Sequence, residues 1–233
     1  YVIEVSESDS NNYYQLTFVE GTFTIRSKSG SSGITIPVLP EDQGNIKLIQ
    51  DGKEEMTSGI EKTIADKQVI EIIAANNSTE LKTVLTGDLV KQLDEKDTVV
   101  TIDHGGVLYS IPAKLLDVDL VAKKLEVSQN DLKSIEFEIK ITRIKEPVNV
   151  SILKAAEDAG YQIVLPPVKF DVLAKTVNQN GNTLAIDISK YSNYISRDFM
   201  IPKGADLSKI TTGIAYDVNG KFSHIPTVVY QKN

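Results

Sequence analysis

The chain lacks cysteine and tryptophan, and only two of its 233 residues are histidine. Without cysteine it can form no disulfide, thiolate zinc site or cysteine nucleophile. No run of about eighteen apolar residues occurs, so we expect no helix that spans a membrane. The formal net charge is −7 and lysines alternate with acids, which leaves no basic patch for nucleic-acid phosphates. We therefore expect no nucleic-acid partner.

Motifs for enzyme chemistry are also absent, including the GxSxG nucleophile elbow, the Walker loop and the GxGxxG fingerprint. His104 and His224 lie far apart and show no metal-ligand spacing, so each is expected to be a satisfied histidine on the surface or in a turn.

Clustered acids could supply carboxylate pairs for a glycosidase or oxygen ligands for calcium. They are Asp94, Glu95, Asp97, Asp103, Asp117, Asp119 and Asp187. A solvated acidic surface is the favoured interpretation, with calcium at a loop and a hydrolase as minor alternatives. We predict no catalytic residue, no metal site and no cofactor, and the ligand-binding residues stay undetermined.

The apolar residues mostly alternate with polar ones, which is typical of half-buried strands. The stretch from Ile135 to Ile144 gives the clearest pattern, with Ile135, Phe137, Ile139 and Ile141 on one face. Short helices are predicted at 87–96, in the second half of 112–127 and at 150–159, with Gly160 ending the last. Strands and helices do not alternate regularly, so we predict a mainly β, β-rich α+β fold of antiparallel sheets and hairpins.

Domain organisation is suggested by a polar, irregular stretch from Lys53 to Asp66, which could be a linker or a short helix. We therefore predict an N-terminal β-hairpin region at 1–66, which could fold as a separate small domain, and a β-rich module at 67–233. Within the second part, 69–74 and 80–85 are expected to pair as an antiparallel hairpin around a turn at 76–78.

Three hairpins share the order strand, glycine-rich turn, strand, Ile-Pro, at residues 23–37, 100–112 and 214–226. In the last of them Asn219-Gly220 favours a type I′ turn. Pro226 places the returning strand at an edge or a bulge, because proline cannot donate to a ladder.

Several short motifs follow one another in the second half of the chain. They are Pro166-Pro167-Val168-Lys169-Phe170-Asp171-Val172, Tyr194-Ile195-Ser196-Arg197, Ile201-Pro202, Lys209-Ile210-Thr211-Thr212-Gly213 and Gly220-Lys221-Phe222-Ser223-His224-Ile225-Pro226-Thr227. This order resembles the strand-rich modules that precede surface-layer homology (SLH) repeats in Gram-positive cell-surface proteins. The resemblance covers about residues 69–233, and no SLH repeat itself is present.

The resemblance implies a non-catalytic, extracellular spacer at the cell wall of a Gram-positive bacterium, whose partners are other domains of the same surface protein. The alternative is a carbohydrate-binding or adhesive module that recognises cell-wall or environmental polysaccharide. Nine tyrosines could form a glycan platform, although core or interface packing is the favoured role for them.

Overall fold

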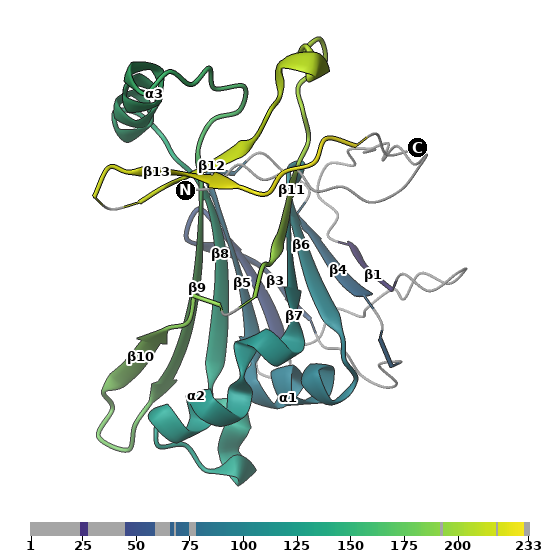
Figure 1. Cartoon of the computed structure of the whole chain (residues 1–233). Helices are drawn as coiled ribbons and strands as arrows, with labels where there is room; N and C mark the ends of the chain where they lie inside the picture. Colours follow the sequence, from purple (N-terminus) through teal and green to yellow (C-terminus); the bar gives the residue numbers. More distant parts are fainter. Residues whose placement is uncertain are drawn as a thin grey trace.

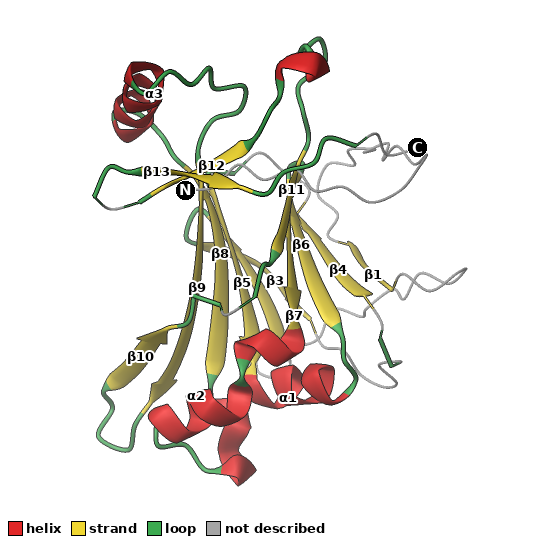
Figure 2. Ribbon diagram, in the orientation of Figure 1, coloured by secondary structure: helices red, strands yellow, loops and turns green. Residues whose placement is uncertain are grey.

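The computed structural model describes residues 24–27, 45–58, 66–67, 69–74, 78–191, 193–217 and 219–230. They form two large sheets, one separate hairpin and a few short helices (Figures 1 and 2). The predicted β-rich fold class is confirmed. The strands expected at 2–5 and 34–38 lie outside the described residues, as does most of the strand expected at 15–26, of which residues 24–26 form part of a described strand.

The larger sheet has six strands, all antiparallel to their neighbours. Their order is β10 (Thr183–Asp187), β9 (Val168–Val177), β8 (Glu136–Arg143), β5 (Glu80–Thr86), β2 (Ile46–Gln50) and β3 (Lys53–Ser58). Phe137, Ile139 and Ile141 of β8 are completely buried, as the alternation predicted. Their partners across the sheet, which include Leu81 and Leu85 of β5, are buried on the same face.

The smaller sheet has five strands, and one of its pairs is parallel. Their order is β1 (Thr24–Ser27), β4 (Val69–Ala74), β6 (Val99–His104), β7 (Val107–Pro112) and β11 (Ser196–Phe199). The expected hairpin of 69–74 with 80–85 is wrong, because β4 pairs with β1 and β6 while β5 joins the other sheet. The chain changes sheet after β4 and returns through α1 (Gly87–Glu95), and such a crossover is what a parallel pair requires.

The inner faces of both sheets contribute to one hydrophobic core. One end of it is closed by α1, α2 (Val118–Lys124) and the 3-10 turns η1 (Ala113–Leu116) and η2 (Gln129–Ser134) (Figure 1). Leu89, Val90 and Leu93 of α1 are buried, which confirms the predicted helical spacing. At Gly87 the backbone comes so close to the Leu132 carbonyl that a Cβ would clash, so the start of α1 needs a glycine.

The opposite end carries α3 (Val148–Asp158), the 3-10 turn η3 (Leu207–Lys209) and the hairpin of β12 (Gly213–Tyr216) and β13 (Phe222–Ile225) (Figure 1). The predicted type I′ turn is wrong, because the Asp217 N–H donates to the Lys221 carbonyl and the Gly220 N–H donates to the Asp217 carbonyl, which a two-residue loop of Asn219-Gly220 would not give. The Asp217 carboxylate closes this connection instead, accepting the N–H groups of Asn219 and Lys221.

The interpretation of the polar stretch after residue 52 as a linker or short helix is wrong for its first six residues, because they form β3. β2 and β3 lie before the predicted domain boundary, yet β2 is hydrogen-bonded to β5, which lies after it. β1 likewise pairs with β4. Each sheet therefore contains strands from both sides of the predicted boundary at residue 66. Independent folding of residues 1–66 stays a prediction.

Candidate functional site

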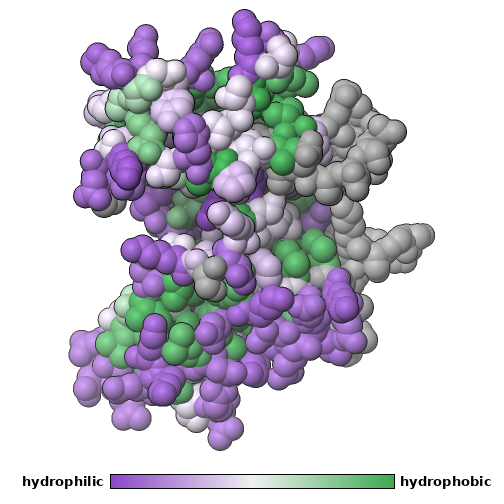
Figure 3. Space-filling model, viewed as in Figure 1, coloured by the Kyte–Doolittle hydropathy of each residue, from purple (hydrophilic) through white to green (hydrophobic). Residues whose placement is uncertain are grey.

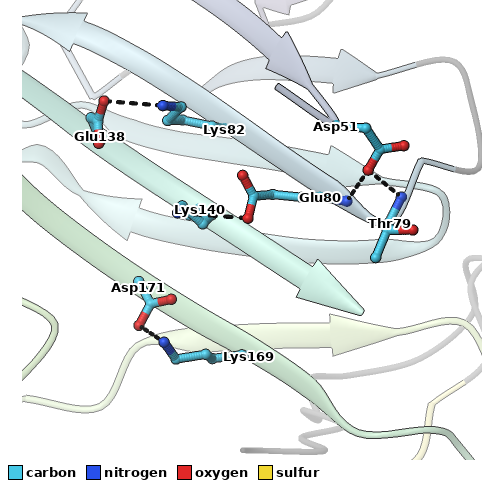
Figure 4. A network of polar contacts seen from close by, with 8 residues as sticks. All are labelled: Asp51, Thr79, Glu80, Lys82, Glu138, Lys140, Lys169 and Asp171. Atoms are coloured by element: carbon cyan, nitrogen blue, oxygen red, sulfur yellow. Dashed lines mark hydrogen bonds and ion pairs between the residues drawn. The ribbon is translucent and has the colours of Figure 1, made fainter. Parts of the chain in front are cut away.

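Charged side chains on the outer face of the six-stranded sheet pair across neighbouring strands (Figure 4). The Nζ atoms of Lys82 and Lys175 lie 3.3 and 2.8 Å from the same carboxylate oxygen of Glu138, and Lys140 lies 3.6 Å from Glu80. Burial opposes the ionisation of Glu138, but the two lysines outweigh it and lower its pKa. A general acid needs a raised pKa. The lowered pKa of Glu138 is the opposite of that requirement, and the side chains on this face form ion pairs.

Three of the acids singled out in the sequence engage in separate local contacts. Asp119 pairs with Lys91 at 2.7 Å, Asp97 lies 3.6 Å from Lys114, and Asp187 accepts the Ser189 N–H at 2.8 Å. Within the described part of the chain no three histidine or acidic side chains come together as a metal would require.

His104 is completely buried, so its expected place on the surface or in a turn is wrong. It is the last residue of β6 and continues the alternation of Val100 and Ile102, which places it on the inner face of the sheet. Burial, with a contribution from Arg143, lowers the pKa of His104 to about 4, and the backbone of Ser78 and Thr79 opposes this only partly. The ring is therefore neutral at physiological pH.

Arg143 links the two sheets beside His104. From the end of β8 its guanidinium donates hydrogen bonds of 2.9 Å to the carbonyl oxygens of His104 and Gly105 in the smaller sheet. Asp103 closes the same turn by accepting the Gly106 N–H at 3.0 Å, and burial raises the pKa of this carboxyl. The Asp-His-Gly-Gly turn is thus held by structural contacts.

Arg197 lies in a second contact between the sheets. Its guanidinium carbon is 5.0 Å from the ring centroid of Tyr109 in β7 and 5.2 Å from that of Phe170 in β9. The two rings are 4.8 Å apart, and Phe170 is 6.1 Å from Phe199 of β11. We call Arg197, Tyr109, Phe170 and Phe199 the aromatic clasp. It brings together the Pro-Pro-Val-x-Phe and Tyr-x-x-Arg motifs, which are separate in the sequence.

The base of the β12–β13 hairpin unites two further motifs. The Gly213 N–H donates to the Thr227 hydroxyl, and Thr227 donates to the Ile225 carbonyl. Thr212 also donates to the Ile225 carbonyl, at 3.2 Å. The Lys-Ile-Thr-Thr-Gly and His-Ile-Pro-Thr motifs are therefore two halves of one hydrogen-bonded junction.

His224 is exposed and contacts the segment that follows α3. The Tyr161 hydroxyl and His224 Nε2 are in hydrogen-bond contact at 3.2 Å, and the Tyr161 ring also packs on Phe222. Phe222 packs on Tyr216 across the hairpin, with ring centroids 4.7 Å apart. These contacts attach the hairpin to the α3 region.

An open cleft of about 160 Å³ lies beside this attachment, between residues 160–165 and 201–214. Its polar lining comes from Tyr161, Gln162, Lys209, Thr211 and Thr212. Apolar side chains complete it: Ile163, Val164, Leu165, Ile201, Ile210 and Ile214. Figure 3 shows hydrophobic surface gathered in this region, between α3 and the segment after β11. Its volume is below the roughly 300 Å³ at which pockets for drug-sized ligands begin.

The tyrosines of the described residues do not gather on one surface. Tyr109 is buried in the core and Tyr161 lines the cleft, whereas Tyr194 is 82% exposed. The sequence did not predict the cleft, because its walls are irregular segments from two distant parts of the chain and no motif marks them.

The chain matches no known family model, no curated protein and no solved structure.

Proposed function

We propose that this chain is a non-catalytic structural module of a bacterial cell-surface protein of the surface-layer type, which spaces or presents other domains of that protein outside a Gram-positive cell. The aromatic clasp is the observation that carries the proposal. Its motif residues, Phe170 and Arg197, contact each other between the two sheets, and Phe170 also packs on Tyr109. These side chains therefore serve to hold the fold together.

Two other features support a structural role. The Arg143 guanidinium, an inner-face group that an enzyme could use, joins the two sheets by donating to the backbone carbonyls of His104 and Gly105. On the outer face, lysines and acids neutralise one another in pairs. A spacer outside the cell needs a protease-resistant fold, and long antiparallel strands with paired charges suit that need.

The experiment that tests this function is surface labelling of cells that carry the full-length protein. Antibodies against the purified module should label intact cells, and mild shaving with protease should remove the label. Labelling that requires permeabilised cells would overturn the proposal. Recovery of all of the full-length protein in the cytosolic fraction, with none in the wall fraction, would overturn it as well.

The second candidate function is carbohydrate binding, and the cleft is the observation that favours it. Its mixture of one aromatic ring, hydroxyl groups and an amide matches what sugars require. Co-sedimentation with purified wall polysaccharide separates the two functions. Saturable binding that Thr211→Val weakens, with Thr183→Val on a distant strand as the matched control, would favour the sugar site. If the module binds less polysaccharide than an unrelated acidic protein does, carbohydrate binding is excluded and the spacer function remains.

A further inference from the structure

The two edges of the six-stranded sheet differ in how they are protected. β3 begins with Lys53 and Glu54, and charged side chains are a usual means of preventing edge-to-edge pairing. β10 has no charge, proline or bulge between Thr183 and Ile186, and Asp187 is its only charged residue. No strand of the described chain pairs with its outer side.

The hydrogen-bond pattern shows which backbone groups of β10 face outward. The Ile188 N–H donates to the Val172 carbonyl, and the Asn178 N–H donates to the Asn182 carbonyl. In an antiparallel ladder such bonded positions recur at every second residue. The residues between them, Thr183, Ala185 and Asp187, therefore direct their N–H and C=O groups away from β9. All three are exposed.

Exposed apolar side chains lie on β10 and on the neighbouring strand β9. Leu184 is 37% exposed and Val177 of the adjoining β9 is 63% exposed. Figure 3 shows hydrophobic surface over the lower ends of β9 and β10, and Figure 1 shows β10 on the outer side of the sheet.

We propose that β10 pairs antiparallel with β10 of a second copy of this chain about a two-fold axis at Ala185, which joins two six-stranded sheets into one. In this register Ala185 lies opposite Ala185 of the other copy, and Thr183 lies opposite Asp187. All the outward-facing backbone groups are then paired, two hydrogen bonds for each facing pair.

The side chains are self-complementary in the same register. Leu184 lies opposite Ile186 of the other copy, so an exposed apolar side chain gains an apolar neighbour. The two Asp187 carboxylates lie at opposite ends of the junction, which keeps like charges apart. A register centred on Leu184 would leave the groups of Asp187 unpaired, so the centre at Ala185 is favoured. The pairing does not depend on the function proposed above.

Sedimentation velocity on the full chain tests the pairing. The wild type should show a concentration-dependent equilibrium between monomer and a closed dimer. Ala185→Pro removes an outward N–H without touching the ladder to β9 and should raise the dimer dissociation constant at least about tenfold. Ala185→Ser keeps the N–H and should behave as the wild type. A monomer at all concentrations, open-ended oligomers or a dimer indifferent to Ala185→Pro would each overturn the proposal.

Cysteine scanning tests the register, and the natural absence of cysteine leaves no background. Hydrogen-bonded antiparallel pairs have Cα atoms about 5.5 Å apart, within reach of a disulfide. Ala185→Cys should therefore cross-link under mild oxidation. Thr183→Cys alone should not, because its copies lie about 14 Å apart along the strands at about 3.4 Å per residue. Thr183→Cys mixed with Asp187→Cys should cross-link. Equal cross-linking of Ala185→Cys and Thr183→Cys would overturn the register.

Discussion

Arg197 lies against the faces of two aromatic rings that belong to different sheets. A cation–π contact contributes about 0.5–1 kcal/mol at an exposed site and about 2 kcal/mol when desolvated, and the stem of the half-buried Arg197 adds packing. We expect Arg197→Ala to lower the free energy of unfolding by about 2–3 kcal/mol and Arg197→Lys by about 1 kcal/mol. Urea denaturation followed by circular dichroism measures both. Lys203→Ala, at an exposed residue, is the control, and a loss there as large as in Arg197→Ala would contradict the role of the clasp.

His104 should make the protein sensitive to acid. Its pKa is lowered from 6.5 to about 4 in the folded state, so the folded chain binds fewer protons than the unfolded chain between these values. The free energy of unfolding should therefore fall by about 3 kcal/mol as the pH drops from about 6.5 to 4, with no further loss from this group below that.

Comparing variants isolates the contribution of His104 to this pH dependence from that of nearby carboxyls such as Asp103. His104→Leu should flatten the slope between pH 6.5 and 4, whatever its effect on stability at pH 7. His224→Gln, at the exposed histidine, should keep the slope of the wild type. Urea denaturation midpoints measured between about pH 6.5 and 4 test this prediction. If the midpoints of His104→Leu depended on pH as steeply as those of the wild type, another group would be responsible.

Element types were predictable from the sequence where one face is apolar. The strand at 136–143 and the helix at 87–95 have the periods of buried faces and were predicted correctly. β3 was missed because an edge strand needs no apolar alternation, and KEEMTS shows none. His104 was misplaced because the turn signal of Gly105-Gly106 outweighed its place in the alternation with Val100 and Ile102.

At the hairpin of β12 and β13, the Thr227 hydroxyl substitutes for a strand partner of the Gly213 N–H. Thr227→Val has a similar shape but leaves this N–H without its acceptor, which costs about 1–2 kcal/mol locally. Hydrogen exchange of the Gly213 amide should accelerate about tenfold or more, while amides of β8 keep their protection. Thr211→Val, at the exposed neighbouring threonine, should leave the Gly213 amide protected. Equal exchange in both variants would remove Thr227 from the junction.

His224 should matter to the hairpin through its contact with Tyr161. His224→Ala removes one exposed hydrogen bond and a ring contact, so we expect a loss of about 0.5–1 kcal/mol in the free energy of unfolding. Tyr161→Phe, which removes only the hydroxyl, should lose less. If His224→Ala abolished binding of a polysaccharide without changing stability, the histidine would be a ligand contact.

The assembly of the whole molecule could not be read from the sequence, because half of the strand pairs in the described chain join strands that are not consecutive along it. β4 and β5 are separated by only five residues yet lie in different sheets, and β11 pairs with β7 across 83 intervening residues. Pairing of this kind is decided by how apolar faces and rings meet in the seam, as at the aromatic clasp. The cleft beside α3 depends on the same long-range assembly.

The position of β2 predicts how far the two parts of the chain depend on each other. β2 lies between β3 and β5, and its inner residues Ile46 and Leu48 are almost completely buried. Burial of each such side chain contributes about 1.5–3 kcal/mol. We therefore expect the fragment 67–233 to unfold at a much lower urea concentration than the whole chain, because β5 loses its neighbour. The fragment 45–233, which keeps β2 and β3, is the matched control and should unfold at an intermediate concentration. A fragment 67–233 as stable as the whole chain would instead show that this part folds without support from residues 1–66.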